Sequence, residues 1–120
     1  LAFLHDSNGL LFSRTNSPNL VILLIDNFGG GIFRQLDVDG IAIGNYEKIF
    51  TMPQKVDPIL LARAYGIICR EISTFEDFQS ALKWSLSIKG VVLLRVCTNS
   101  AKDTELREII RNDLFNLFNH

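Results

Sequence analysis

The sequence predicts an α/β fold, a partial doubly wound parallel sheet with flanking helices, on three observations. Apolar runs of strand length at residues 20–25, 67–72 and 91–96 alternate with segments of helical periodicity. The run at 20–25 is continuous rather than alternating, which is typical of a central parallel strand covered on both faces. Only three such runs occur, whereas sheets of this kind usually hold about five or six strands. We therefore expect part of a domain.

The first half begins with a predicted short helix over about residues 6–14, with Leu10 and Leu11 on its apolar face. Pro18 breaks this helix, because proline disfavours helical geometry in the residue before it. The strand at 20–25 then ends in Asp26-Asn27-Phe28 and three glycines. Residues 34–54 are too many for an ordinary connection, so we expect a functional loop with a short helix inside it.

A capped helix is predicted next. Asp57-Pro58 is typical of a helix start and Gly66 of a helix end. We expect the buried face of this helix to consist of Leu60, Leu61 and Ala64. The strand at 67–72 follows.

The last third predicts two helices around the strand at 91–96. Residues 74–77 resemble a capping box, and Gly90 ends the helix that they begin. Its expected apolar face holds Phe75, Phe78, Leu82 and Leu86. The final helix, over about residues 102–118, places these apolar residues on one side: Leu106, Ile109, Ile110, Leu114, Leu117 and Phe118.

Composition excludes several classes of function. The chain has 12 basic and 13 acidic residues, a net charge of −1, so we expect no nucleic-acid partner. Its longest apolar run, at 20–25, is six residues, far short of the roughly 20 that span a bilayer, so we expect no membrane insertion. Cys69 and Cys97 form no CxxC pair and lie in predicted strands. They are expected to be reduced, buried and inert thiols of a cytoplasmic protein.

The turn after the first strand is where chemistry is expected. Ligands of open parallel sheets collect beyond the carboxyl ends of the strands, where Asp26-Asn27-Phe28 and Gly29 to Gly31 lie. Asp and Asn supply hard oxygen ligands, and glycines let a phosphate approach the backbone. A magnesium ion with a phosphate group and a ligand-free turn both suit these residue types, because neither GxGxxG nor GxxxxGK[ST] is present.

Several segments resemble the thiamine-diphosphate-dependent enzymes. These enzymes carry Gly-Asp, somewhat over two dozen residues, and then Asn-Asn at the end of a hydrophobic strand; Asp26-Asn27 resembles the second half of this motif. Its Gly-Asp would fall immediately before Leu1. The segments 1–6, 8–10, 27–33 and 50–54 together resemble one branch of the family. That branch decarboxylates 2-oxoglutarate and adds the succinyl carbanion to isochorismate in menaquinone and phylloquinone biosynthesis.

The resemblance implies a set of site residues. Mg²⁺ (or Mn²⁺) would be bound by the Asn27 side-chain oxygen, the Gly29 carbonyl and the Asp expected before Leu1. Thiamine diphosphate would contact Asn27, Gly29 and four further residues: Leu1, Ala2, Gly30 and Ile32. Phe33 and Leu36 would line the substrate pocket, although ordinary core packing also explains the apolar residues. No catalytic residue is expected in this chain, because the family's ylid-forming Glu lies in another domain.

The sequence departs from the family pattern at two positions. The family usually has Asn where Asp26 stands and commonly a polar residue where Phe28 stands. The Asp26 carboxylate would either add negative charge near the cation or face away from it. Arg34 is the arginine nearest to this turn in the sequence, and we expect it to be a solvated loop residue.

The resemblance also implies an organisation for the whole protein. Residues 1–120 would be the C-terminal part of a diphosphate-binding domain, with upstream domains absent and the isolated fragment inactive. The full protein would be a homodimer or homotetramer of the cytoplasm, or of the plastid stroma in a plant-type source. Another thiamine-diphosphate 2-oxo-acid decarboxylase or an acetohydroxyacid synthase is an alternative. A stand-alone flavodoxin-like module is a further alternative, which predicts about five strands.

Overall fold

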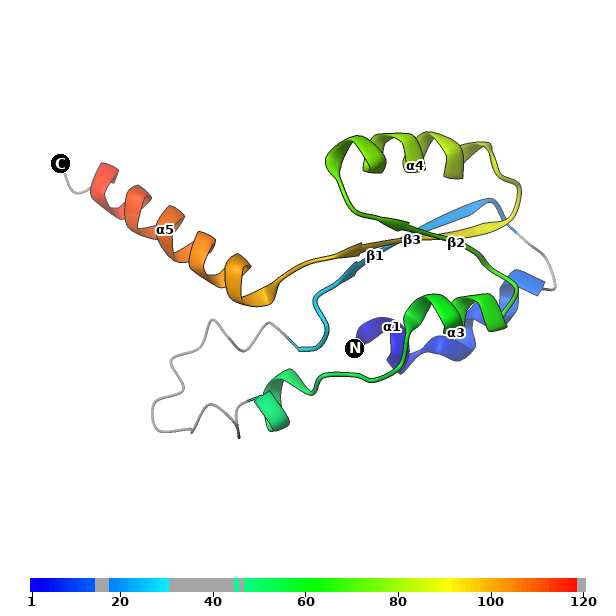
Figure 1. Ribbon diagram of the computed structural model, residues 1–120, viewed down its shortest axis with the longest axis horizontal. Coiled ribbons are helices and arrows are strands. Elements are labelled where there is room, and N and C mark those ends of the chain that lie inside the picture. Colours follow the sequence, from blue (N-terminus) through cyan, green and yellow to red (C-terminus); the bar gives the residue numbers. More distant parts are fainter. Residues whose placement is uncertain (15–17, 31–44, 46, 119–120) are drawn as a thin grey trace.

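The computed structural model describes residues 1–14, 18–30, 45 and 47–118, and shows a three-layered α/β arrangement (Figure 1). Three parallel strands form a sheet in the order β1-β3-β2: β1 (Leu20–Asp26), β2 (Ile68–Ile72) and β3 (Val91–Cys97). Helix α4 (Phe75–Ser87) covers one face, and α3 (Pro58–Ala64) with the N-terminal helices covers the other. The predicted α/β class is therefore confirmed.

The N-terminal segment contains α1 (Ala2–His5) and a 3₁₀ helix, η1 (Ser7–Arg14), where we expected one short helix. The sequence Ser7-Asn8-Gly9 explains the tighter geometry, since all three residue types are poor α-helix formers. Leu10 is buried as expected, but Leu11 is exposed, so its predicted place on the apolar face was wrong.

Helix α3 begins where its cap predicted. The Asp57 carboxylate accepts hydrogen bonds from the N–H groups of Ile59 (2.8 Å) and Leu60 (3.4 Å), and Gly66 follows the helix with φ of 80°. The predicted face was wrong: the buried residues are Pro58, Ile59 and Ala62, whereas Leu60 and Ala64 are exposed and Leu61 is half-buried. Local capping fixes the start of a helix, but contact with the sheet decides which side it buries.

In helix α4, too, the predicted cap is confirmed and most of the predicted buried face is wrong. Thr74 caps it, accepting a hydrogen bond from the Asp77 N–H at 3.1 Å. Of the predicted apolar face only Phe78 packs against the core, while Phe75, Leu82 and Leu86 are exposed. Ala81 and Ser85 are buried instead, and their small size allows the helix backbone to lie close to β2 and β3. The Ser85 hydroxyl is satisfied because it donates to the Leu82 carbonyl at 2.8 Å.

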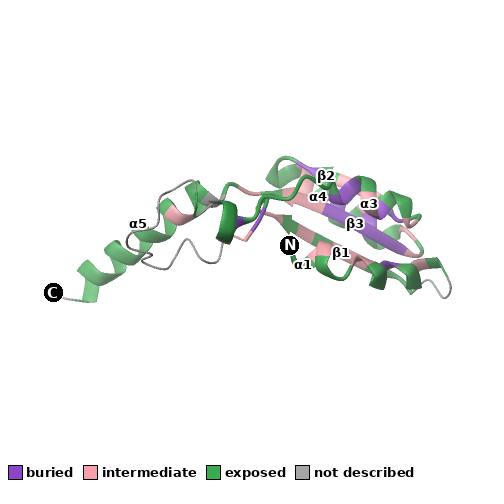
Figure 2. Cartoon of the chain, turned by 90° about the horizontal axis from the view of Figure 1, so that it is seen from below, coloured by how far each residue is buried: buried purple, intermediate pink, exposed green. Residues whose placement is uncertain are grey.

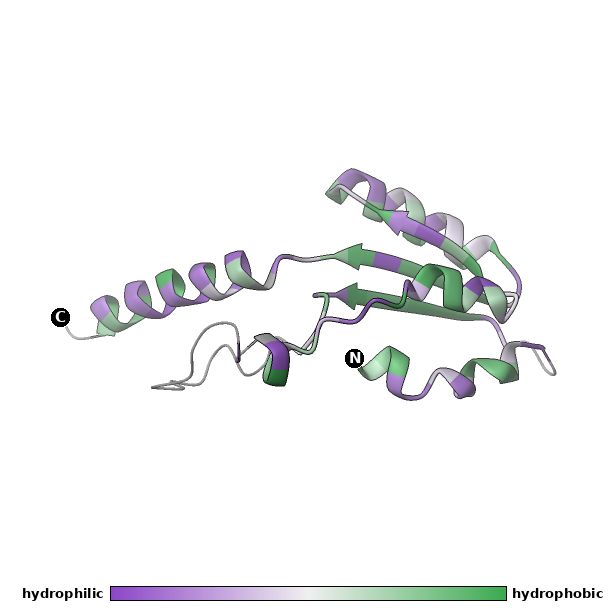
Figure 3. Ribbon diagram, turned by 60° about the horizontal axis from the view of Figure 1, so that its bottom comes forward, coloured by the Kyte–Doolittle hydropathy of each residue, from purple (hydrophilic) through white to green (hydrophobic). Residues whose placement is uncertain are grey.

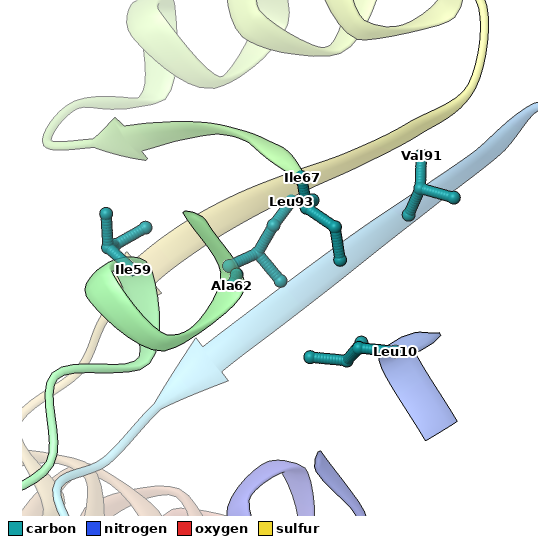
Figure 4. Packing of buried hydrophobic residues seen from close by; sticks show 6 residues of the cluster. All are labelled: Leu10, Ile59, Ala62, Ile67, Val91 and Leu93. Atoms are coloured by element: carbon teal, nitrogen blue, oxygen red, sulfur yellow. The ribbon is translucent and has the colours of Figure 1, made fainter. Parts of the chain in front are cut away.

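Strand β3 divides the core into two clusters, because successive side chains point to opposite faces. Val91 and Leu93 pack with α3 and η1, and Figure 4 shows the cluster of Leu10, Ile59, Ala62, Ile67, Val91 and Leu93. Val92 and Leu94 pack on the other side with Ile72 and Ala81. The central strand carries the most deeply buried residues (Figure 2).

Strand β1 lies at the edge of the described sheet, although its continuous apolar sequence predicted a central strand. On the α4 side, Leu23 and Ile25 remain 46% and 63% exposed, because α4 packs mainly over β2 and β3. Some of the apolar side chains of β1 are therefore not covered by the other described residues.

The connection after β1 and the final helix complete the described chain. A single π-helical turn, η3 (Glu47–Thr51), lies within the expected functional loop, most of which falls outside the described residues. Helix α5 (Ser100–Phe118) confirms the last predicted helix and projects away from the sheet (Figures 1 and 3). Its six predicted apolar residues are all exposed. Among the described helices, none is both long and apolar enough to cross a membrane.

Candidate functional site

The candidate site lies beyond the carboxyl ends of β1 and β3, where Asp26 and Cys97 are register partners. A cavity of about 220 Å³ opens here. Its walls come from the chain start, the end of β1, the turn after β1, the segment before α3, and β3; they include Leu1, Leu24, Asp26, Gly29, Gln54 and Arg95. The topology thus places the predicted turn where ligands of parallel sheets collect.

Two side chains of the turn after β1 bond to its own backbone. The Asp26 Oδ1 accepts a hydrogen bond from the Phe28 N–H at 3.0 Å, and the Asn27 Oδ1 accepts one from the Gly29 N–H at 3.3 Å. Such Asx turns replace the strand ladder once β1 has ended. They also help hold Phe28 at a φ of 59°, a left-handed conformation that is uncommon outside glycine.

The two glycines that follow pass very close to the η3 segment. A Cβ atom on Gly29 would lie 2.2 Å from the Thr51 carbonyl oxygen, and one on Gly30 would lie 2.6 Å from the Phe50 carbonyl oxygen. The Gly30 N–H donates to the Thr51 carbonyl at 2.6 Å. Only glycine fits this close approach of two backbones.

Five of the predicted site residues can be placed. Leu1 and Gly29 line the cavity, and Gly30 lies beside Leu1, whose Cδ1 atom would be 3.4 Å from a Cβ at position 30. Ala2 is exposed at the start of α1, and Asn27 is half-buried; both stand outside the described cavity lining. Ile32, Phe33 and Leu36 lie outside the described residues, as does Arg34.

The donor chemistry fits a magnesium-bound diphosphate. The Asn27 amide oxygen uses one lone pair inside the turn and keeps a second. Glycine leaves the backbone carbonyls of the turn uncovered by side chains, whereas the Gly29 and Gly30 N–H groups already bond to Asn27 and Thr51. The Thr51 hydroxyl is buried beside Gly29 and has no hydrogen-bond partner among the described residues. In that part of the chain no three His, Cys, Asp or Glu side chains gather into a metal site. The predicted ligand set would not require such a group.

Sequence reasoning missed the strongest electrostatic feature of the site, Arg95 on β3. Its Nε and Nη2 atoms donate to the Asp26 Oδ2 at 2.9 and 2.7 Å, and its Nη1 lies 3.4 Å from the Glu71 Oε1. The guanidinium carbon also stands 5.6 Å from the centre of the Phe28 ring. Partial burial alone would lower the pKa of Arg95, but the hydrogen bonds to Asp26 and the nearby charges outweigh it and raise the pKa.

One signal for Arg95 was available. It is the single charged residue in an otherwise apolar strand, two positions before the strand ends. Such a residue needs a partner when buried, and Asp26 ends another strand of the same sheet.

The cysteines differ from expectation. Cys69 is half-buried and Cys97 is exposed, so the prediction of two buried thiols was wrong for Cys97, which stands at the open end of β3. Burial nevertheless raises the pKa of both thiols, with Glu71 adding to the effect at Cys97. Both therefore remain mostly protonated at neutral pH, and the structure gives neither a nucleophile's environment.

Known proteins match most of this chain in sequence. Residues 2–96 match the family described as "Thiamine pyrophosphate enzyme, C-terminal TPP binding domain". The 2-succinyl-5-enolpyruvyl-6-hydroxy-3-cyclohexene-1-carboxylate synthase of one strain of Prochlorococcus marinus is 51% identical over 114 residues. The synthases of the same name from a second strain, Prochlorococcus marinus (strain NATL1A), and from Synechococcus sp. (strain CC9902) are each 47% identical, over 114 and 112 residues. These alignments cover 93–95% of this chain and 19–20% of the relatives, so the chain spans about a fifth of their length.

Proposed function

This chain belongs to the thiamine pyrophosphate (thiamine diphosphate) enzymes, within their C-terminal cofactor-binding domain, and we propose that it supplies the diphosphate-binding turn of a carbon–carbon bond-forming synthase. The reaction we propose is decarboxylation of 2-oxoglutarate and addition of the succinyl carbanion to isochorismate. Identity of 47–51% to relatives named as 2-succinyl-5-enolpyruvyl-6-hydroxy-3-cyclohexene-1-carboxylate synthase supports it. The single observation that carries the proposed diphosphate-binding role is the glycine turn after β1, which packs closely against Thr51.

The residues of the turn have distinct proposed roles. Asn27 and Gly29 would bind Mg²⁺ (or Mn²⁺) through an amide and a carbonyl oxygen, which are ligands that this ion accepts. The backbones of Leu1, Ala2 and Gly30 would approach the diphosphate. When bound, thiamine diphosphate supplies the stabilised carbanion, so this chain's residues need only bind and orient it.

The apolar part of the proposed pocket is carried by three residues after the turn. Ile32 would lie near the thiazolium, and Phe33 and Leu36 would line the substrate pocket. Apolar side chains there would exclude water from a carbanion, which water would otherwise protonate.

We propose that residues 1–120 are the C-terminal part of a diphosphate-binding domain, and that further domains and additional copies, in a homodimer or homotetramer, complete the enzyme. A third metal ligand and the ylid-forming Glu would come from outside this chain. The product would enter menaquinone or phylloquinone biosynthesis, in the cytoplasm or plastid stroma. Another thiamine-diphosphate decarboxylase or an acetohydroxyacid synthase would share the turn, but the relatives' names favour the first reaction. The family match disfavours a flavodoxin-like module.

The test compares donor substrates in the full-length protein. With thiamine diphosphate, Mg²⁺ and isochorismate present, we expect CO₂ release from 2-oxoglutarate and negligible release from pyruvate. Preference for pyruvate would instead support one of the alternative enzymes. No CO₂ release from either acid would contradict the proposed function.

The same experiment includes a variant of the metal ligand. Asn27→Ala should raise the dissociation constant for thiamine diphosphate at fixed Mg²⁺ by roughly tenfold or more, because one metal ligand is lost. Asn19→Ala is the matched control, since Asn19 lies at the opposite end of β1 and bonds only to the Gly90 N–H among the described contacts. Unchanged affinity in Asn27→Ala would rule out its metal role.

A further inference from the structure

We propose that Arg95 is a positioning residue of the cofactor-binding turn: it neutralises Asp26 and keeps that carboxylate out of the metal's coordination. The inference rests on the proposed function, because it concerns how the turn meets a magnesium-bound diphosphate. It assigns roles to Asp26 and Phe28, the two residues that flank the proposed metal ligand Asn27.

Both oxygens of Asp26 accept hydrogen bonds within the structure, and Oδ2 uses both of its lone pairs. Its Oδ1 accepts the Phe28 N–H at 3.0 Å, and its Oδ2 accepts two N–H groups of Arg95 at 2.9 and 2.7 Å. The Asp26 side chain is 17% exposed, so water screens this pair only partly. The Asp26 Oδ2 therefore has no lone pair left for a metal, and the positive charge of Arg95 beside the carboxylate disfavours a cation at Oδ1.

Phe28 meets the same guanidinium. The guanidinium carbon of Arg95 lies 5.6 Å from the centre of the Phe28 ring, within the range of a cation–π contact. Phe28 is also the left-handed residue of the turn, with φ of 59°. Arg95 therefore contacts the turn on both sides of Asn27, through its preceding and its following residue.

Arg95 is itself held firmly enough to position its neighbours. It stands on the central strand, its side chain is 11% exposed, and Glu71 and Asp57 lie 3.4 and 3.8 Å from its Nη1. A planar guanidinium can satisfy several such partners at fixed angles, which the point charge of a lysine cannot. Through these contacts of Arg95, the central strand of the sheet helps to fix the conformation of the turn that follows β1.

Loss of Arg95 should affect cofactor binding through charge. Asp26 would become an uncompensated, mostly buried carboxylate beside the proposed diphosphate, and it would repel that anion. Removing the Asp26 charge as well should relieve the repulsion. An asparagine at position 26 can still accept the Phe28 N–H and so retain the turn.

The experiment is a double-mutant cycle in the full-length protein. Thiamine diphosphate is titrated at saturating Mg²⁺ by calorimetry for the parent, Arg95→Gln, Asp26→Asn and the double variant. We expect Arg95→Gln to weaken binding about tenfold, and the double variant to recover to within about threefold of the parent. A purely structural role for Arg95 would give no such recovery.

A second ion pair provides a matched control. Arg70 of β2 bonds to Asp77 of α4 and lies 5.8 Å from the Trp84 ring centre, so it too pairs with a carboxylate and an aromatic ring, but it does not line the described cavity. We expect Arg70→Gln and Asp77→Asn to leave the cofactor dissociation constant unchanged. If Arg95→Gln does not fold, Arg95→Lys keeps the positive charge but loses the planar, multidentate guanidinium. It should weaken thiamine diphosphate binding about threefold.

Three results would overturn the inference: unchanged affinity in Arg95→Gln, a double variant that binds no better than Arg95→Gln, or an equal loss in Arg70→Gln. A parent protein that binds no thiamine diphosphate would instead reject the proposed function itself. The two failures are therefore distinguishable in one set of titrations.

Discussion

Gly29 is under the strictest steric constraint among the described residues of the candidate site. Its backbone passes so close to Thr51 that any side chain would collide with a carbonyl oxygen rather than with a flexible side-chain end. Relief would require the turn and the η3 segment to separate, and that would break the hydrogen bond from the Gly30 N–H to Thr51. The position therefore links packing directly to the geometry of the proposed metal ligands.

We expect Gly29→Ala to destabilise the full-length protein by about 1–3 kcal/mol, because a 2.2 Å approach forces the backbone to move. Affinity for thiamine diphosphate should fall at least about tenfold in the same variant. Gly9→Ala is the control, since a Cβ there would meet Asp6 at an ordinary 3.7 Å. Urea unfolding and calorimetry measure the two effects; equal behaviour of the two variants would contradict the constraint.

Single residues also show how far the sequence predicts the site. Asn27 and Gly29 could be predicted as metal ligands because a motif places them close together in the chain, and this role stays a prediction. The charge of Arg95 in an apolar strand indicates that it needs a partner, but the sequence does not identify Asp26 as that partner, because the two lie 69 positions apart and only the β1–β3 pairing brings them together. The roles of Ile32, Phe33 and Leu36 also stay predictions, and these three lie outside the described residues.

At the scale of elements, the sequence predicts where helices start better than which side they bury. The caps Asp57 and Thr74 form as expected, because a cap depends on residues two or three positions away. The buried faces of α3 and α4 depend on how each helix lies on the sheet. Both helices bury small residues, such as Ala62 and Ala81, in place of the leucines expected there.

The start of α4 makes a testable prediction of pH dependence. Arg70 donates a hydrogen bond to Asp77 and lowers the pKa of that carboxyl, with a further contribution from the Ser73 N–H. A carboxyl whose pKa is lower in the folded state stabilises the fold above its unfolded pKa of about 3.9. That contribution is lost as the pH falls through the folded pKa.

Asp77→Asn should therefore be less stable than the parent at pH 7, and the difference should shrink as the pH falls below about 4. Thermal unfolding over a pH series measures this. Glu76→Gln changes the same charge at the neighbouring position and serves as the control. A stability difference for Asp77→Asn that is independent of pH would contradict the role of its ionised form.

The molecule as a whole is extended. Its radius of gyration is 18.0 Å, against about 14 Å for a compact domain of this length. Helix α5 projects from the sheet with its apolar residues exposed, and the β1 edge leaves Leu23 and Ile25 partly open. These features support the proposal that the chain functions together with further domains of a longer enzyme.

We expect the 120-residue chain alone to bind thiamine diphosphate and Mg²⁺ much more weakly than the full-length protein and to be inactive. The proposal places one metal ligand and the ylid-forming Glu outside this chain, so the isolated turn would hold the ion with too few protein oxygens. Parallel calorimetric titrations of the two proteins provide the comparison. Micromolar binding by the 120-residue chain would contradict the expectation.

The strand order has a consequence for how the protein is made. β3 lies between β1 and β2, yet it is the last of the three to be synthesised, and Leu20 pairs with Val91, 71 positions later. Until the ribosome has released residues 91–97, β1 and β2 have no partner in the described sheet. The nascent chain therefore carries β1 unpaired from its synthesis onward, and both β1 and β2 unpaired while residues 73–90 are being made, which makes this last interval its period of greatest vulnerability to aggregation.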